Sequence, residues 1–240
     1  MSPFSQVRFV LVETSHPGNV GAAARALKTM GFGRLVLVAP RHPNIVRKQE
    51  AIALASGALD VLDAAQVVDS VEAALAGAQL TVALTARPRE FGPQRSDPRS
   101  VATAAADWLG AAPAEDAGRE VAFVFGNERY GLPNDAVARC GQVVHIPTNP
   151  DYSSLNLAQA VQLIAWEMRS ALLADAPPAL PKIGFAGELA SSEQVEQMYA
   201  HLEAALVAVG FLDPEQPKRL MPRLRRLFSR TQLEAEEVNI

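Results

Sequence analysis

The chain has 240 residues, of which 49% are hydrophobic and 20% charged, and its formal net charge is −4. This length fits one α/β domain with a small extension, and the acidic balance restricts any nucleic-acid site to a local basic patch. One cysteine excludes an internal disulfide, and four scattered histidines form no metal-ligand cluster. With no signal-like or membrane-length apolar run, these features predict a soluble cytoplasmic protein without a metal.

Apolar segments rich in β-branched residues alternate with segments of helical periodicity along residues 1–174. This alternation is typical of a parallel sheet with helices on both faces. Ligands of such sheets bind beyond the carboxyl ends of the strands, so the informative loops follow Val12, Leu84, Val124 and Ile146. The predicted strands are 7–13, 34–40, 65–68, 80–86, 121–126 and 143–147, and the predicted helices are 20–30, 48–60, 70–77, 99–109 and 154–173.

The first loop, within the stretch "ETSHPGNVGAAARALKTMGFGRLVLVAP", looks like the glycine loop of a nucleotide-binding fold. His16 stands where the first glycine of that loop should be, and the next strand ends without the acid that would bind a ribose. No Lys-Ser/Thr pair follows Gly21, so a Walker-type phosphate loop is disfavoured as well. We therefore interpret the stretch as a tight turn, with Asn19 as helix N-cap and Gly21 permitting close helix packing.

Arg25 lies on the helix that follows this loop, about 140° around its axis from Val20. It is roughly opposite the apolar stripe formed by Val20, Ala24 and Leu27. This position predicts a solvated surface side chain when the segment is considered alone.

Polar residues also follow two later strands. The strand in "VAFVFGNERYGLP" ends at Gly126, Asn127 and Glu128, where the acid is either a site residue or an ordinary cap or loop carboxylate. The strand in "VVHIPTNPDYSSLNLAQAVQLIAWEMR" leads through a proline-bent loop to a helix opened by Ser153, Ser154 and Asn156. An ordinary N-cap would explain Ser154 equally well.

A proline-rich segment, 175–190, separates the first 174 residues from a helical extension at 191–240. Ser191 and Gln194 form a capping-box pattern, and a second helix is expected from Pro222 to about Arg230. A third helix is expected to begin at Thr231.

The segment 216–230 carries six cations and no acid, which favours either a solvated face or phosphate contacts. The arginines in this segment that we expect to bind RNA are Arg219, Arg223, Arg225, Arg226 and Arg230. The segment 86–99, with Arg87, Arg89, Arg95 and Arg99, is a candidate lid or a plain surface loop.

Together, three of these segments resemble the three motifs of the SPOUT superfamily of S-adenosylmethionine-dependent RNA methyltransferases. The similarity is greatest to the TrmH-like branch that methylates ribose 2′-hydroxyls, and within it to TrmJ-type enzymes of the tRNA anticodon loop. The first motif, N-x-G-x-x-A-R, matches residues 19–25, and the second, F-G-x-E, matches residues 125–128. The third, from I-P to S-L-N, matches residues 146–156.

The resemblance implies a parallel sheet with a C-terminal trefoil knot, a homodimer and S-adenosylmethionine as methyl donor. It implies methylation of a cytidine or uridine ribose in tRNA, at position 32 of the anticodon loop. The residues implied for catalysis are Arg25, Asn19, Glu128, Ser154 and Asn156. Those implied for donor binding are Thr85, Ala86, Arg87, Gly126, Ile146, Ser154, Leu155 and Asn156.

Arg25 is implied to activate the ribose hydroxyl across the dimer interface, with Glu128 orienting its side chain. A guanidinium is effectively always protonated, so it either transfers the proton through a phosphate or water, or stabilises the developing alkoxide as a positive clamp. We favour the clamp with phosphate assistance. Two other functions stay open: a non-catalytic knotted RNA-binding or assembly module, and a Rossmann-type nucleotide enzyme that the missing ribose acid disfavours.

Overall fold

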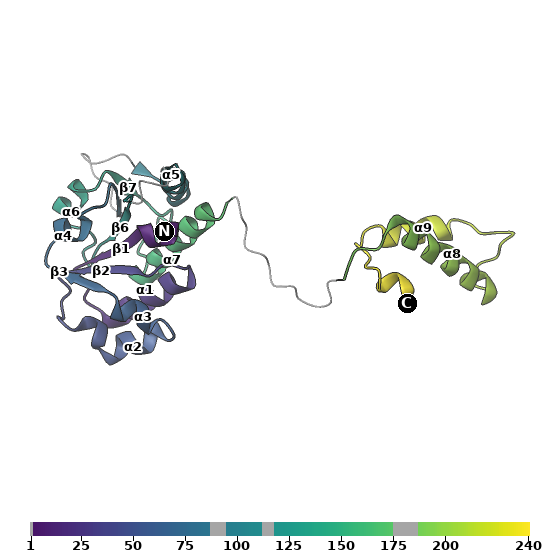
Figure 1. The fold of residues 1–240 in the computed structure, drawn as a ribbon, viewed down its shortest axis with the longest axis horizontal. Coiled ribbons are helices and arrows are strands. Elements are labelled where there is room, and N and C mark those ends of the chain that lie inside the picture. Colours follow the sequence, from purple (N-terminus) through teal and green to yellow (C-terminus); the bar gives the residue numbers. More distant parts are fainter. Residues whose placement is uncertain (1, 87–94, 112–117, 175–186) are drawn as a thin grey trace. The chain divides into compact units, whose positions relative to one another are not determined.

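The computed structural model describes residues 2–86, 95–111, 118–174 and 187–240. The chain divides into two compact units, residues 1–177 and residues 178–240 (Figure 1). The first unit is the α/β domain and the second is helical.

A parallel sheet forms the centre of the first unit, as the sequence predicts. Within the described residues its strand order is β3-β2-β1-β6-β4-β7-β5. The trefoil knot expected from the resemblance stays a prediction. The strands are β1 (Val7–Val12), β2 (Arg34–Val38), β3 (Gln66–Val68), β4 (Leu80–Leu84), β5 (Arg95–Ser96), β6 (Val121–Phe125) and β7 (Gln142–Val144).

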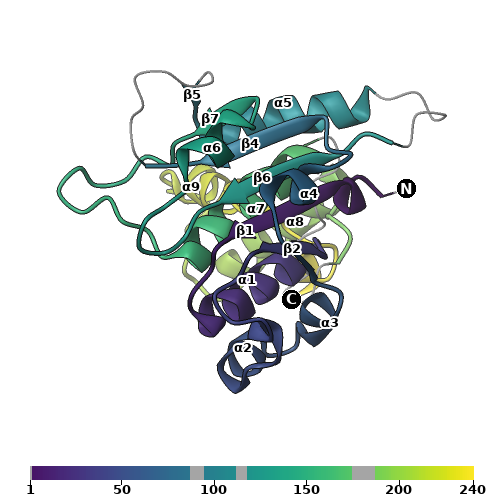
Figure 2. The same ribbon diagram turned by 90° about the vertical axis from the view of Figure 1, so that its left-hand side faces the viewer.

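Helices cover both faces of this sheet (Figure 2). The side chains of Phe9 and Leu11 in β1 belong to one buried cluster, and those of Val10 and Val12 to the other. Burial on both faces explains why the strands are continuously apolar. The first cluster includes residues of α1 (Pro17–Thr29), α2 (Gln49–Ala55), α3 (Leu59–Asp63), α5 (Pro98–Gly110) and α7 (Leu157–Leu172), and the second includes residues of α4 (Val71–Leu75) and α6 (Asn134–Ala138).

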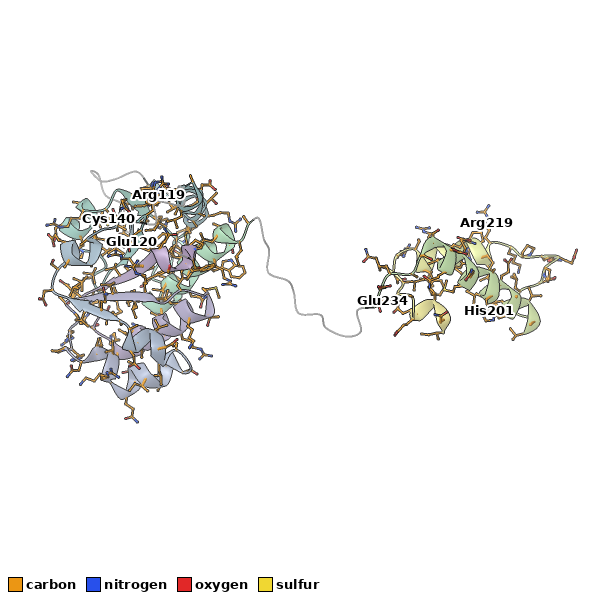
Figure 3. The ribbon with its side chains drawn as sticks, viewed as in Figure 1. Arg119, Glu120, Cys140, His201, Arg219 and Glu234 are labelled. Carbon is orange, nitrogen blue, oxygen red and sulfur yellow. The ribbon has the colours of Figure 1, made fainter. Side chains whose placement is uncertain are left out.

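Paired charges occupy the amino end of the sheet. Glu120, which precedes β6 beside Arg119 (Figure 3), forms ion pairs with Arg8 and with Arg34. Arg8 is only 7% exposed, and its burial lowers the pKa of the guanidinium below the ordinary value. This end of the sheet is therefore structural, and the ligand space lies at the opposite end.

Three helix starts and ends differ from the sequence prediction. The helix α1 begins at Pro17 after His16, so Asn19 lies inside the first turn instead of serving as N-cap. The predicted helix 48–60 is divided into α2 and α3, because Ser56 adopts a φ of 52° that a helix cannot contain. The helix α7 begins only at Leu157, with Asn156 as its N-cap.

The second unit contains α8 (Ser192–Ala208), α9 (Leu220–Phe228) and a short 3-10 helix, η3 (Glu237–Asn239). The capping box of Ser191 and Gln194 is confirmed at the start of α8. The helix start predicted at Thr231 is wrong. Residues 233–235 pair with residues 188–190 instead, through hydrogen bonds from Ala190 N–H to Leu233 O and from Ala235 N–H to Glu188 O, both 2.8 Å.

Candidate functional site

A cavity of about 510 Å³ opens where three adjacent strands end. The last residues of β4, β6 and β7, namely Leu84, Phe125 and Val144, give it an apolar base. Because β4 lies between β6 and β7 in the sheet, the loops after these strands converge around one space. The loop and helix residues that complete the lining are Thr85, Ala86, Gly126, Asn127, Glu128, Arg129, Gly131, Ile146, Thr148, Ser153, Ser154, Leu155, Leu157 and Ala160.

The loop after β6 is held tightly closed. Asn127 and Gly131 exchange backbone hydrogen bonds of 3.1 and 2.8 Å, and Gly131 has a φ of 72°. A Cβ atom on Gly126 would stand 2.1 Å from the Gly131 carbonyl carbon, so only glycine fits there. This closure fixes the backbone that presents Glu128 to the cavity.

The Glu128 carboxylate accepts hydrogen bonds from residues just before α1 and in its first turn. Its Oε2 accepts from the Ser15 N–H at 3.0 Å and from the Ser15 hydroxyl at 2.9 Å. Its Oε1 accepts from the His16 N–H at 3.2 Å and from the Asn19 side-chain amide at 2.9 Å. The second motif is thus bonded directly to the first, across more than 100 residues of sequence.

The third motif joins the same network through Asn156. Its side-chain amide donates to Asn19 Oδ1 at 2.9 Å, while its own Oδ1 accepts from the Ala158 and Gln159 N–H groups as N-cap of α7. Glu128, Asn19 and Asn156 therefore form one continuous hydrogen-bonded series. Each side chain fixes the orientation of the next.

This network also sets the ionisation of Glu128. Partial burial by itself raises the pKa of the carboxyl group, but the hydrogen bonds from Asn19 and Ser15 outweigh it. The pKa of Glu128 consequently lies below its ordinary value, and the residue is an anion at the edge of the cavity at neutral pH.

Arg25 does not line this cavity within one chain. Its side chain is exposed on α1, whereas Val20, Ala24 and Leu27 are fully buried, which confirms the orientation predicted from helical spacing. Among the residues that the structure describes, Arg25 forms no ion pair, and the expected contact with Glu128 is absent. The hydrogen-bond donors of Ser15, His16 and Asn19 contact the Glu128 carboxylate instead.

Gly21 of the first motif has a packing role. A Cβ atom there would stand 2.0 Å from the Ala51 carbonyl oxygen, so the glycine allows α1 to lie directly against the backbone of α2. The sequence prediction of close packing at Gly21 is correct.

The cavity brings together most of the residues expected to bind the donor. Asn156 stands apart, in the hydrogen-bonded network, and Arg87 lies outside the described residues. Ser15 was missed by sequence analysis, because a lone hydroxyl in a loop gives no pattern. The expected residues that line the cavity are Thr85, Ala86, Gly126, Ile146, Ser154 and Leu155.

Most of the candidate lid at 86–99, including Arg87 and Arg89, lies outside the described residues. Arg95 belongs to β5 and Arg99 to the first turn of α5. Arg99 also pairs with Glu167 of α7, with Nε and Oε2 3.2 Å apart. These two arginines are therefore on regular secondary structure and not on a loop.

In the helical unit, Arg225 differs from the other arginines of α9. Its guanidinium makes two hydrogen bonds to the Glu196 carboxylate, at 2.5 and 2.6 Å, and lies over the Tyr199 ring at 4.3 Å. Tyr199 is buried in α8 and donates a hydrogen bond of 3.4 Å to the Arg225 carbonyl oxygen. Arg225 thus holds α9 against α8.

The other four arginines lie at 219, 223, 226 and 230, a spacing of four, three and four residues. Arg223 and Arg226 lie in α9, roughly 60° apart around its axis and at least about 100° from Arg225, while Arg219 is the N-cap residue and Arg230 follows the end of the helix. All four side chains are exposed, and none forms an ion pair with another described residue. We call Arg219, Arg223, Arg226 and Arg230 the arginine stripe.

Residues 2–86, 95–111, 118–174 and 187–240 contain no group of three metal-ligating side chains. No helix in the same part of the chain is long and apolar enough to cross a membrane.

Comparison with known proteins identifies two matching family models. Residues 6–166 match the SpoU rRNA methylase family, and residues 193–240 match the C-terminal domain of the tRNA methyltransferase TrmJ. A relative from Pseudomonas aeruginosa, "tRNA (cytidine/uridine/adenosine-2′-O-)-methyltransferase TrmJ", is 46% identical over 98% of this chain and 90% of its own length. The "tRNA (cytidine/uridine-2′-O-)-methyltransferase TrmJ" of Klebsiella pneumoniae is 45% identical over 98% of this chain and 92% of its own length.

Solved structures give the same result. A probable methyltransferase from Bordetella pertussis is 55% identical, covers 72% of this chain and 100% of its own, and has a TM-score of 0.67. TrmJ from Z. mobilis is 32% identical, covers 97% of this chain and 94% of its own, and has a TM-score of 0.74. This chain therefore belongs to the SpoU rRNA methylase family, among its TrmJ-type members.

Proposed function

We propose that this protein transfers a methyl group from S-adenosylmethionine to a ribose 2′-hydroxyl of tRNA. The observation that carries the proposal is the convergence of the three family motifs. Glu128, Asn19 and Asn156 form one hydrogen-bonded network beside a cavity of ligand size. Relatives that match over nearly the whole chain carry names with the same activity.

The cavity has the size and chemistry to hold this donor. Its volume of about 510 Å³ lies within the usual range for small-molecule sites. The apolar base of Leu84, Phe125 and Val144 suits a flat adenine ring, and backbone groups at the strand ends can bind its edges. The anionic Glu128 suits a ligand with cationic groups. The donor, when bound, supplies a methyl group on a positively charged sulfur.

The residues proposed to hold the donor surround this base. They come from the loops after β4, β6 and β7, which the parallel sheet brings to one edge. They are Thr85, Ala86, Gly126, Ile146, Ser154 and Leu155.

Arg25 and the donor cavity belong to one site only if two chains combine. The helix α1 packs against α7, and Leu163 and Trp166 of α7 are 41% and 54% exposed. A homodimer would cover this apolar surface and would bring Arg25 of one chain to the cavity of its partner. This arrangement also gives a role to a cation that has no acidic partner within the described residues.

At such a composite site, Arg25 stabilises the negative charge that develops on the ribose 2′-oxygen. The 2′-oxygen forms the new bond to the methyl carbon, and its proton passes to a phosphate oxygen of the RNA or to water. Asn19 and Ser154 position the ribose and the guanidinium by hydrogen bonds. Glu128 acts one step away, by holding Asn19.

We further propose that the substrate nucleotide is a cytidine or uridine at position 32, as in the TrmJ-type resemblance. The arginine stripe then binds the tRNA backbone, because a guanidinium fork matches phosphate oxygens. Arg225 is excluded from this role by its pairing with Glu196. A tRNA substrate is consistent with a cytoplasmic location.

The test is to incubate bulk tRNA with the protein and isotope-labelled S-adenosylmethionine, and to analyse nucleosides by mass spectrometry. We expect labelled 2′-O-methylcytidine or 2′-O-methyluridine. Stoichiometric donor binding without labelling of any tRNA would favour the non-catalytic RNA-binding module instead.

A further inference from the structure

The helical unit contains a second cavity, formed by the turn between α8 and α9. Its volume is about 470 Å³. One exposed aromatic side chain, Phe211, and three cations line it together with apolar and amide groups. The lining residues are Phe211, Leu212, Asp213, Gln216, Pro217, Lys218, Arg219, Leu220 and Arg223.

The exposure of Phe211 is imposed by the backbone. The helix α8 ends at Ala208, and Gly210, with a φ of 72°, turns the chain just beyond it. The N–H groups of Phe211 and Leu212 both donate to the Leu206 carbonyl at 3.0 Å. Leu212 is thereby anchored at 5% exposure, while the neighbouring Phe211 is 70% exposed. A single exposed apolar residue is common, but this one stands at the wall of a cavity that also contains cations.

The charges in this cavity are available to a ligand. Arg219, which Figure 3 labels, and Arg223 belong to the arginine stripe and form no ion pair with described residues. The one carboxylate of the lining, Asp213, accepts the Glu215 N–H at 2.9 Å and shapes the turn. The cavity therefore offers an aromatic face, the side-chain amide of Gln216 and a net positive charge.

We propose that this cavity binds one unpaired nucleotide of the tRNA, with its base on Phe211 and its phosphate on Arg219 and Arg223. An aromatic face beside cations fits a single-stranded nucleotide, because a base inside a duplex cannot expose its flat face. The inference rests on the proposed function for its substrate. It goes further by assigning the helical unit a site for a flipped or loop base, in addition to backbone contacts.

The test compares tRNA affinities of full-length variants by fluorescence anisotropy. Phe211→Ala should weaken binding about tenfold, because the stacking of one base on the ring is lost. Phe211→Trp should retain full affinity. The matched control is Val209→Ala, because Val209 is 76% exposed just before the same turn and does not line the cavity. Its affinity should equal that of the wild type.

A second readout identifies the ligand. In Phe211→Trp, the added indole fluorescence should be quenched by a short single-stranded RNA and not by the same RNA in a duplex. The wild type, with its two tryptophans, supplies the background. The salt slope of affinity should stay unchanged in Phe211→Ala and fall by about 0.7 to 0.9 in Arg223→Gln.

Unchanged tRNA affinity of Phe211→Ala would overturn the proposal, as would equal quenching by duplex and single strand. A change of oligomeric state with unaltered RNA affinity would also overturn it and would assign Phe211 to a protein interface. These readouts need no methyl transfer. A protein that methylates no tRNA but shows the Phe211 effect would therefore refute the proposed function and not this site.

Discussion

The donor cavity and the arginine stripe present polar groups in opposite ways. At the cavity, Glu128 accepts four hydrogen bonds, and Asn19 and Asn156 bind one another. On the stripe, four guanidiniums face solvent without an acidic partner among the described residues. The first region is organised by its own hydrogen bonds, whereas the guanidiniums of the second have no acidic partner among the described residues to hold them in place.

This contrast separates the two regions by their response to mutation and salt. Groups held by short hydrogen bonds act through position, so losing one should lower the rate of the bound complex. Exposed cations act through charge that salt screens over about 8–10 Å, so their loss should lower affinity. Changes at the cavity are expected in kcat, and changes at the stripe in KM for tRNA.

The largest effect is expected from Arg25→Ala. Loss of the group that stabilises the alkoxide should reduce kcat by on the order of 10³-fold. Binding of S-adenosylmethionine, measured by calorimetry, should stay within a few fold of wild type. The control is Lys28→Ala on the same helix, whose exposed cation pairs with Asp60 at 2.8 Å and should be dispensable.

A mixture of inactive subunits tests whether this site spans two chains. Arg25→Ala and Glu128→Gln subunits should each be inactive alone. If Arg25 acts at the partner's cavity, half of the randomly mixed dimers contain one intact site, and about a quarter of the wild-type activity returns. If no activity returned, either Arg25 would act at the cavity of its own chain or the protein would not form the proposed dimer.

A smaller effect is expected from Asn19→Ala, which removes the link between Glu128 and Asn156. A loss of roughly 10²-fold in kcat is expected for one positioning group. The exposed Gln159→Ala on α7 is the control. A change in KM alone would show that Asn19 contributes to binding and not to positioning.

The same variant should also reveal the ionisation of Glu128. Because its pKa is lowered in the folded chain, the carboxylate stabilises the fold above the ordinary value of 4.5 and loses this contribution as pH falls through the folded pKa. The difference in free energy of unfolding between wild type and Asn19→Ala should thus be largest near pH 7. It should shrink below pH 4.5, as urea titrations would measure.

The smallest effect on turnover is expected at the stripe. The double variant Arg223→Gln with Arg226→Gln should leave kcat unchanged and reduce the salt slope of tRNA affinity by roughly 1.5. Arg225→Gln is the matched comparison. It should leave the salt slope unchanged and lower the melting temperature of the helical unit, because it breaks the contact with Glu196. Equal salt slopes for the double variant and for Arg225→Gln would refute the distinction between the arginine stripe and Arg225.

Much of the molecule can be predicted from sequence, where the signal is local. Alternating apolar strands and helical segments predict the parallel α/β class, and Ser191 with Gln194 marks the start of α8. Helical spacing places Arg25 opposite the buried stripe of α1. The three motifs indicate the family before any coordinates are considered, because each is a short run of residues that can be recognised without knowing its distant partners.

Only the tertiary structure decides which groups bind one another. The order of the strands brings the ends of β4, β6 and β7 together, and Glu128 then reaches donors at 15–19 in place of Arg25. Likewise, Arg225 and Arg226 are neighbours in sequence, yet Arg225 pairs with Glu196 of α8 and Arg226 forms no ion pair with a described residue. The physical reason is that periodicity fixes the direction of a side chain around its own helix or strand. Its hydrogen-bond partner depends on which distant segment the packed core places opposite.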